Sequence, residues 1–243
     1  MVNLWQKLRK QKPEVHAWQE FYQRFEDRFR GSQHDIEARF RTRYTPQIQD
    51  VMNHHPRLRA LDLGCGRGEF LNIINSYNGQ GTGIDNNREA VKRCVAAGHN
   101  AIESDILDHM KKIPDSSFDL ITSFHVIEHC DPPYFLQIFK EAYRILSKNG
   151  ALLIETPSLY SLWASARQFY LDPTHIRPIH PEYMMFMAED CGFSEVSTIE
   201  FEEVDDPRRA HLLRGLPRPD EANLKNLDRW LYGSMDIALW ARK

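Results

Sequence analysis

Apolar residues recur along the chain with two different periods, and each period predicts a different kind of element. Near the start, five apolar residues follow one another at intervals of three and four, which places them on one face of a helix. Ser32 and Asp35 then resemble a capping box for a second helix to about Tyr44, and Thr45-Pro46 suits the first turn of a third. The five apolar residues are Val15, Trp18, Tyr22, Phe25 and Phe29.

From Leu58 onward, short apolar runs alternate with segments of helical spacing. This alternation predicts an α/β fold with a doubly wound, mostly parallel sheet. We expect an N-terminal helical lid over residues 1–55 and one α/β domain over residues 56–243, with insertions at about 156–179 and 205–232. The strands are expected in RLRALDLG, GQGTGID, HNAIESD, SFDLITSFHVI, GALLIETPS, EVSTIEFEEV and SMDIALWAR.

Composition and charge narrow the classes of function. The 243 residues are 42% hydrophobic and 27% charged, with a net charge of −3, which argues against a nucleic-acid partner. No apolar run approaches the roughly 20 residues of a membrane span, and the N-terminus lacks an apolar signal core, so we expect a cytoplasmic protein. The four cysteines show no CxxC spacing, which predicts neither disulfides nor a zinc site.

The stretch LDLGCGRGEF predicts a ligand-binding turn between a strand and a helix. Gly64, Gly66 and Gly68 permit positive φ angles and let a ligand approach the backbone. A dinucleotide fingerprint would space its glycines as G-x-G-x-x-G, whereas this stretch has G-x-G-x-G. Asp62 would repel a pyrophosphate but suits a ligand that carries an amino group. The alternative is a tight turn without a ligand.

Acidic residues follow the next two predicted strands. Asp85 is placed to accept hydrogen bonds from both hydroxyls of a ribose. Asn86 or Asn87 at the same turn could instead serve as the N-cap of the helix that follows. Asp105 could accept a bond from an adenine amino group while Ile106 covers the ring, although a solvated acidic turn is a comparable reading.

Together these motifs resemble the ordered motifs of class I S-adenosylmethionine-dependent methyltransferases, over about residues 58–155. The resemblance implies a Rossmann-like sheet of seven strands with the last one antiparallel. It also implies S-adenosylmethionine as the cofactor and S-adenosylhomocysteine as the product. The residues that it assigns to the cofactor are Asp62, Gly64, Cys65, Gly66, Gly68, Asp85, Asn86, Asp105, Ile106, Ser123 and Phe124.

A narrower resemblance lies outside these motifs. FYQRFEDRFRGS, HVIEH, ETPS and FYLDPTHIRP are similar to a bacterial group of methyltransferases encoded with lipopolysaccharide, O-antigen and capsule synthesis, often fused to glycosyltransferases. This implies O-methylation of a sugar hydroxyl on a glycan or lipid-linked sugar, with a glycosyltransferase as a possible partner, in a monomer or homodimer. The alternatives are a small-molecule O- or N-methyltransferase of quinone or natural-product type, and a cofactor-binding module that regulates a partner enzyme.

One motif points elsewhere and is set aside. DPPY, which begins at Asp131, spells the signature of methyltransferases that act on adenine in DNA. In those proteins it ends the fourth strand, whereas here that strand would end about six residues earlier. Asp131 followed by two prolines instead reads as a helix N-cap with proline in the first turn.

Three histidines are candidates for a general base that activates an acceptor hydroxyl. His175, oriented by Asp172, is our first choice, and His125 at the end of the fourth strand is its main rival. His129 with Glu128 could hold a divalent metal, which would favour the quinone-type alternative. However, HVIEH lacks the HExxH order of zinc hydrolases, and we expect no metal. The candidate acceptor-binding residues are Tyr170, Arg177, Trp163 and Arg28.

Overall fold

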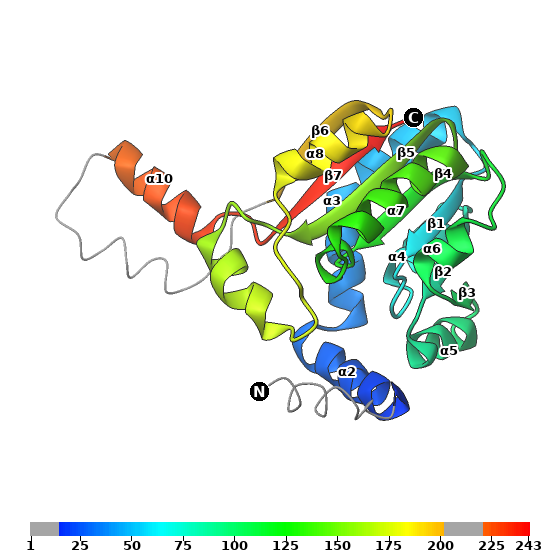
Figure 1. The fold of residues 1–243 in the computed structure, drawn as a ribbon, viewed down its shortest axis with the longest axis horizontal. Helices are drawn as coiled ribbons and strands as arrows, with labels where there is room; N and C mark the ends of the chain where they lie inside the picture. Colours follow the sequence, from blue (N-terminus) through cyan, green and yellow to red (C-terminus); the bar gives the residue numbers. More distant parts are fainter. Residues whose placement is uncertain (1–14, 202–220) are drawn as a thin grey trace, which may run out of the picture.

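The computed structural model describes residues 15–201 and 221–243 (Figure 1). Seven strands are found in this part of the chain, and each overlaps a segment predicted as a strand, although the fifth begins four residues earlier than expected, in a stretch predicted to be helical. They are β1 (Arg59–Leu63), β2 (Gln80–Asp85), β3 (Asn100–Glu103), β4 (Phe118–Phe124), β5 (Leu146–Pro157), β6 (Ser194–Glu200) and β7 (Asp236–Arg242).

The seven strands form one sheet in the order β3-β2-β1-β4-β5-β7-β6. Strand β7 pairs antiparallel with β5 and β6, and the other neighbouring pairs are parallel. The predicted doubly wound, mostly parallel sheet with an antiparallel last strand is therefore confirmed. The order reverses between β1 and β4, and in open α/β sheets ligands bind at such a switch point, beyond the carboxyl ends of the strands.

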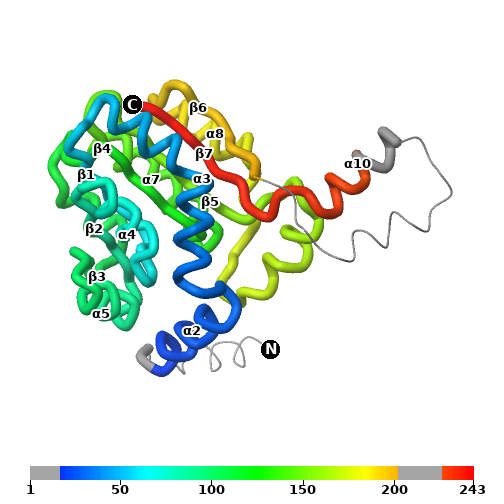
Figure 2. Tube along the Cα trace, turned by 180° about the vertical axis from the view of Figure 1, so that it is seen from behind, coloured from blue at the N-terminus to red at the C-terminus, as the bar shows by residue number. Residues whose placement is uncertain are grey.

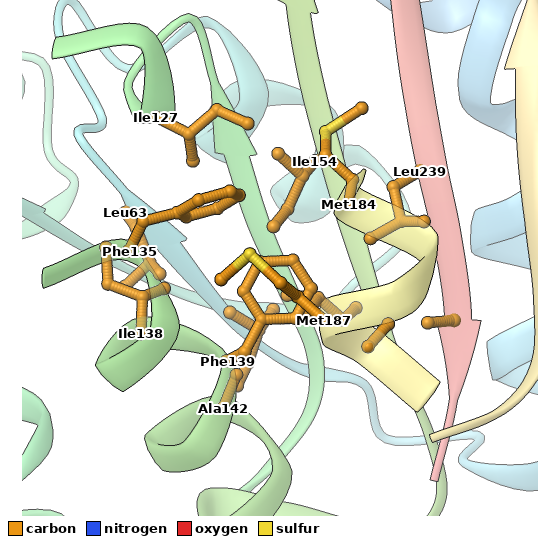
Figure 3. Packing of buried hydrophobic residues seen from close by; sticks show 14 of the residues in the cluster. Leu63, Ile127, Phe135, Ile138, Phe139, Ala142, Ile154, Met184, Met187 and Leu239 are labelled. Carbon is orange, nitrogen blue, oxygen red and sulfur yellow. The ribbon is translucent and has the colours of Figure 1, made fainter. Parts of the chain in front are cut away.

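Helices cover both faces of the sheet. In the view from behind, α3 (Gln33–His54) lies across one face of the sheet (Figure 2). On that face, Phe40 of α3 and Phe70 of α4 (Glu69–Ser76) pack against Leu120 and Leu153. On the other face, α7 and α8 bury a second cluster against Leu63 and Ile154 (Figure 3). The principal helices are α2 (Val15–Phe29), α3 (Gln33–His54), α4 (Glu69–Ser76), α5 (Arg88–Ala96), α6 (Ile106–Met110), α7 (Pro132–Ile145), α8 (Pro181–Asp190) and α10 (Glu221–Tyr232).

Two helices predicted between Ser32 and the first strand form one. Helix α3 runs through Pro46 without a break, and Ser32 caps it by accepting a hydrogen bond from the Asp35 amide. Proline removes one backbone hydrogen bond from a helix, but Tyr44, Ile48 and Val51 are buried on either side of it. Tertiary packing therefore outweighs the local cost, and α3 shares a core with the sheet.

Sequence patterns identified some helix starts and missed others. Asp131 accepts a hydrogen bond from the Tyr134 amide at 2.9 Å, so DPPY forms the predicted N-cap and first turn of α7. The short helix α6 and the helix α10 were not predicted. Residues 205–220 of the predicted insertion lie outside the described residues. Among those described, no helix combines the length and hydropathy that a bilayer span requires.

Candidate functional site

A cavity of about 770 Å³ opens at the carboxyl ends of β1, β2 and β4, and α2 forms its opposite wall. The residues that line it come from both sides of the sheet's switch point, and most are polar or aromatic. They are Trp18, Gln19, Tyr22, Glu26, Arg30, Gly64, Gly66, Asp85, Asn86, Asn87, Ala90, Asp105, Ile106, Phe124, His125, Val126, His129, Cys130, Asp131, Tyr134, Thr174 and Ile176.

The glycine loop between β1 and α4 requires glycine for two separate reasons. Gly64 has φ of 72°, in the left-handed region, and a Cβ there would lie 2.4 Å from Val126 Cγ2. Gly66 has φ of 52°, and its Cβ would lie 3.0 Å from a guanidinium nitrogen of Arg30. Both glycines line the cavity, so the loop presents bare backbone to a ligand.

Asp85 binds the glycine loop to the turn after β2. Its Oδ2 accepts a hydrogen bond from Gly66 N at 2.9 Å, and its Oδ1 accepts one from Asn87 N at 2.7 Å. Burial raises the pKa of Asp85, while these two backbone hydrogen bonds oppose the shift. Each carboxylate oxygen keeps acceptor capacity, because a carboxylate offers about four lone-pair positions. Asp85 can therefore accept two ligand hydroxyls at the cavity wall.

A second acidic residue closes the far end of the cavity. Asp105 caps α6 by accepting a hydrogen bond from the Asp108 amide, and it also accepts one from the Tyr134 hydroxyl at 2.8 Å. Ile106 lies beside it on the cavity wall. The Asp105 carboxylate can accept a hydrogen bond from the edge of a nucleobase, and Ile106 can pack against the face of its ring.

The turn after helix α2 supplies a basic side chain that faces the glycine loop. Arg30 lies just beyond the helix end, 3.2 Å from Glu26 Oε1, and the two side chains are 22% and 18% exposed. Arg28, which we expected to bind the acceptor, is exposed on the same segment, stacks on Phe29 and does not line the cavity. The side chain placed to meet a ligand carboxylate is therefore that of Arg30.

His125 is held by buried acidic groups and is charged. Its Nε2 lies 3.1 Å from Glu155 Oε1 and its Nδ1 lies 3.3 Å from Glu128 Oε1. Burial would lower the pKa of His125, but these carboxylates and Asp236 raise it to about 10. Arg43 completes the network, with contacts of 2.9 Å to Glu155 and 2.8 Å to Asp236. Because both ring nitrogens face carboxylates, His125 has no lone pair for an acceptor proton.

The backbone of His125 is also unusual. Its φ is 56°, in the left-handed region that residues with a Cβ adopt at a cost of roughly 1–3 kcal/mol. The strain is held in place by a 2.9 Å hydrogen bond from the His125 amide to the Glu155 carbonyl. Strained residues of this kind cluster at functional sites.

The predicted pair of His175 and Asp172 does not form in the structure. His175 Nδ1 instead lies 2.6 Å from the Phe169 carbonyl, and the side chain does not line the cavity. Burial lowers the pKa of His175, although Glu128 opposes the shift. Asp172 accepts hydrogen bonds from the Tyr22 hydroxyl at 2.7 Å and from Thr174. The base role proposed for His175 therefore has no geometric support.

Asp172 orients a different histidine, through Thr174. The Thr174 hydroxyl lies 2.6 Å from Asp172 Oδ1 and 2.8 Å from His129 Nδ1. His129 lines the cavity, at the end of the short helix η1 (Ile127–His129) that follows β4. Tyr22 of α2 donates a hydrogen bond to Asp172, which links that helix to this series of hydrogen bonds.

The other residues expected to bind the acceptor lie outside the cavity. Tyr170 is 70% exposed, and Trp163 packs against Tyr232 of α10 and the Arg167 guanidinium. Arg177 lies over the ring of Tyr183. These three residues remain candidates for binding the acceptor only if the acceptor extends beyond the cavity along residues 156–179.

The groups that line the cavity match the parts of S-adenosylmethionine that the motifs imply. Asp85 would accept the ribose hydroxyls, Ile106 would cover the adenine, and Arg30 would meet the methionine carboxylate. The residues assigned to the cofactor divide into those that line the cavity and those buried behind it. Gly64, Gly66, Asp85, Asn86, Asp105, Ile106 and Phe124 line it, whereas Asp62, Cys65, Gly68 and Ser123 do not.

Sequence reasoning missed much of the α2 wall and the loop after β4. The spacing of Trp18 and Tyr22 predicted a helix face within the expected N-terminal lid, without indicating which of its residues line the cavity. The Arg43, Glu155 and Asp236 network gave no sequence signal, because its members come from three distant elements. Thr174 lies within the segment that we singled out, but nothing local distinguishes it from a turn residue.

Comparisons with known proteins agree on one family. A family model described as a methyltransferase domain matches residues 61–154. A crystal structure of an S-adenosylmethionine-dependent methyltransferase from Archaeoglobus fulgidus is 32% identical, with a TM-score of 0.79, covering 92% of this chain and 100% of that chain.

Curated proteins give a similar result over shorter spans. A probable S-adenosylmethionine-dependent methyltransferase of Mycobacterium tuberculosis is 26% identical over 165 residues, which are 67% of this chain and 58% of that protein. A ubiquinone biosynthesis O-methyltransferase of Xanthomonas campestris is 32% identical over 108 residues, which are 42% of this chain and 44% of that protein. The chain spans 53% to 58% of the length of the first four curated relatives that it matches.

Proposed function

Because the chain belongs to the S-adenosylmethionine-dependent methyltransferases, we propose that it transfers a methyl group from that cofactor to a hydroxyl oxygen. The acceptor that we propose is a sugar hydroxyl on a surface polysaccharide or its lipid-linked precursor, made alongside a glycosyltransferase. The sequence blocks FYLDPTHIRP and HVIEH support this acceptor.

The observation that carries the proposal is the arrangement of Asp85, Gly66 and Arg30 around one cavity. A carboxylate with free acceptor capacity, a bare glycine backbone and a guanidinium face the same space. These three features match the ribose, the linking chain and the carboxylate of the cofactor. S-adenosylmethionine, when bound, supplies a methyl group that its sulfonium has already activated.

The remaining task of the protein is to hold the acceptor oxygen in line with that methyl group. Alignment alone can supply roughly 7–11 kcal/mol of the barrier. Tyr22, His129, Thr174 and Ile176 line the cavity and come from α2 and from the loops after β4 and β5. We assign the acceptor to this side, because the other walls match parts of the cofactor.

The proposal is tested by offering the protein labelled cofactor together with lipid-linked glycan, quinone precursor and tRNA fractions. We expect label in the glycan fraction. Label confined to the quinone precursor would favour the second candidate, a small-molecule O-methyltransferase, which the likeness to the Xanthomonas campestris protein supports. Label confined to tRNA would refute both. Cofactor binding without transfer to any fraction would favour a regulatory module.

Arg30 should contribute strongly to cofactor affinity. Replacing it by methionine, Arg30→Met, removes a charged hydrogen-bond donor of the kind worth about 1.5–3 kcal/mol, so the dissociation constant should rise at least about tenfold. Calorimetric titration with S-adenosylhomocysteine measures the change. Arg28→Met is the matched control, because Arg28 is exposed two residues away, and it should bind as wild type. Equal affinities of the two variants would contradict the role of Arg30.

Asp62 should make cofactor affinity depend on pH. Burial raises its pKa to about 7, although the Thr122 hydroxyl donates a hydrogen bond to it at 2.7 Å and opposes the shift. Asp62 lies behind the cavity wall, so it acts on the amino group of the cofactor through its negative charge and not by direct contact. Protonation removes that charge, so affinity should fall as the pH drops below about 7. Asp62→Asn should bind weakly with a flatter pH profile. A wild-type affinity that is constant between about pH 6 and pH 8 would exclude this role.

A further inference from the structure

Three donor atoms converge beside the cavity from two separate loops. Glu128, His129 and His175 each bring one potential metal ligand to within 4.8 Å of the others. The two imidazole rings lie 4.7 Å apart between centroids, and His175 Nε2 lies 3.8 Å from Glu128 Oε1. His129 also lines the cavity, so the cluster borders the space assigned to the acceptor.

Hydrogen-bond directions leave both neutral imidazoles with a lone pair on Nε2. His175 Nδ1 faces the Phe169 carbonyl at 2.6 Å, and a carbonyl only accepts, so this nitrogen carries the hydrogen. His129 Nδ1 faces the Thr174 hydroxyl at 2.8 Å, and that hydroxyl uses its one hydrogen for Asp172 at 2.6 Å. His129 Nδ1 must therefore donate, which leaves its Nε2 without a hydrogen.

Glu128 provides a buried oxygen that forms an ion pair with His125 but accepts no hydrogen bond among the described residues. Its side chain is fully buried, and Oε2 accepts a hydrogen bond from the Thr156 hydroxyl at 3.1 Å. Oε1 has no hydrogen-bond partner among the described residues. The 3.3 Å contact with His125 Nδ1 is an ion pair that lacks hydrogen-bond geometry. The ion pair with His125 leaves Oε1 with acceptor capacity, which a bound cation would use.

We propose that Glu128, His129 and His175 bind a divalent transition-metal ion. The two imidazoles and Glu128 Oε1 all offer lone pairs, and one cation can accept all three. Two imidazoles and one carboxylate form a recurrent metal-binding set that leaves coordination positions open. Ligand bonds of about 2.0–2.1 Å place donor atoms about 3.3 Å apart, so atoms that now lie within 4.8 Å of one another would approach by up to about 1.5 Å on binding.

The surroundings of the two histidines support this assignment. Histidines that bind metals almost always donate their other ring hydrogen to a carboxylate, carbonyl or water, which fixes the ring. The Phe169 carbonyl does this for His175, and Thr174 with Asp172 does it for His129. The segment FYLDPTHIRP thus supplies one ligand and the groups that orient both imidazoles.

A neighbouring cluster of similar composition does not compete for the ion. His125, Glu155 and Asp236 also bring potential ligand atoms close together. There, however, the Arg43 guanidinium contacts both carboxylates, and both ring nitrogens of His125 face carboxylates. That cluster already contains the cations that balance its acids.

The ion would activate a hydroxyl acceptor, either the proposed sugar or the quinone-type alternative, and this role rests on the proposed transfer to oxygen, whereas metal binding itself does not. A hydroxyl oxygen bound to a cation has a lowered pKa and releases its proton to water more readily. As the oxygen–methyl bond forms and the sulfur–methyl bond breaks, the sulfonium becomes a neutral thioether and one proton enters solution. Neither His125 nor His175 needs to accept that proton.

Cobalt binding to the full, untagged chain tests the site, because the visible absorption of Co²⁺ reports its coordination. After treatment with chelator, we expect one Co²⁺ per chain, displaced by Zn²⁺. His129→Ala and His175→Ala should each weaken binding at least about tenfold. Thr174→Val keeps the shape but loses the hydroxyl, and it should weaken binding about 10–100-fold, as changes behind metal ligands do. His34→Ala, which removes an exposed histidine, should bind as wild type.

Two results would overturn the site. One is the absence of bound Co²⁺ in wild-type protein that circular dichroism shows to be folded. The other is wild-type affinity in both His175→Ala and Thr174→Val. The role of the ion fails separately if methyl transfer continues at full rate in chelator. Metal binding without any methyl transfer would instead refute the proposed function and leave the site standing.

Discussion

Replacing Asp85 by asparagine should raise the dissociation constant for S-adenosylmethionine by about 100-fold or more. Two charge-assisted hydrogen bonds to the ribose, each worth about 1.5–3 kcal/mol, depend on this carboxylate. Its two oxygens also accept hydrogen bonds from Gly66 N and Asn87 N. An amide has one oxygen, so its NH₂ group would have to face one of these N–H donors. Calorimetric titration of Asp85→Asn measures the loss.

Glu103→Gln is the matched control for this change. Glu103 ends the adjacent strand β3 and is exposed, 3.8 Å from Arg88, outside the cavity. The control therefore removes a carboxylate from the same edge of the sheet without touching the ribose position. We expect its affinity to equal that of wild type. A loss in Glu103→Gln as large as that in Asp85→Asn would mean that overall charge, and not ribose binding, sets the affinity.

Replacing Arg43 by methionine should lower the free energy of unfolding by about 3–5 kcal/mol, the usual cost of breaking a buried ion pair from one side. The guanidinium is 15% exposed and contacts two carboxylates, those of Glu155 and Asp236. Glu155 also accepts a hydrogen bond from the Tyr44 hydroxyl, and contacts His125. Without Arg43, the buried carboxylates of Glu128, Glu155 and Asp236 would share one cation, the imidazolium of His125. Urea unfolding followed by circular dichroism measures the effect.

Arg41→Met, on the same helix, controls for the loss of an arginine. Arg41 donates a hydrogen bond to the neutral Ser76 hydroxyl at 2.8 Å, so its loss should cost about 1 kcal/mol or less. If Arg43→Met and Arg41→Met lose equal stability, the buried network does not hold β5, β7 and α3 together as we infer.

The sheet and the glycine loop could be predicted from sequence because their signals are local. Apolar runs give the strands, and the glycines mark a turn where Gly64 and Gly66 adopt positive φ. Asp85 was identifiable because the turn that follows a strand also fixes which edge of the sheet its side chain reaches. These features need only the residues within one strand and the turn after it.

The catalytic side of the cavity could not be predicted in the same way. Asp172 was expected to orient His175, whereas the structure places its carboxylate against the Thr174 hydroxyl, which in turn contacts His129 across the fold. Proximity in sequence favoured His175, whose ring turns instead to the Phe169 carbonyl. Pro46 likewise suggested a break that packing of α3 prevents. In each case a tertiary contact decided between local alternatives.

The most direct test is to follow a ¹³C-labelled methyl group from S-adenosylmethionine into the acceptor by NMR. We predict that wild-type protein produces the signal of a methyl ether on a sugar carbon, and that Asp85→Asn produces it far more slowly at the same cofactor concentration. A labelled methyl group on nitrogen or carbon, or cofactor binding with no labelled product from any hydroxyl acceptor, would contradict O-methylation by this site.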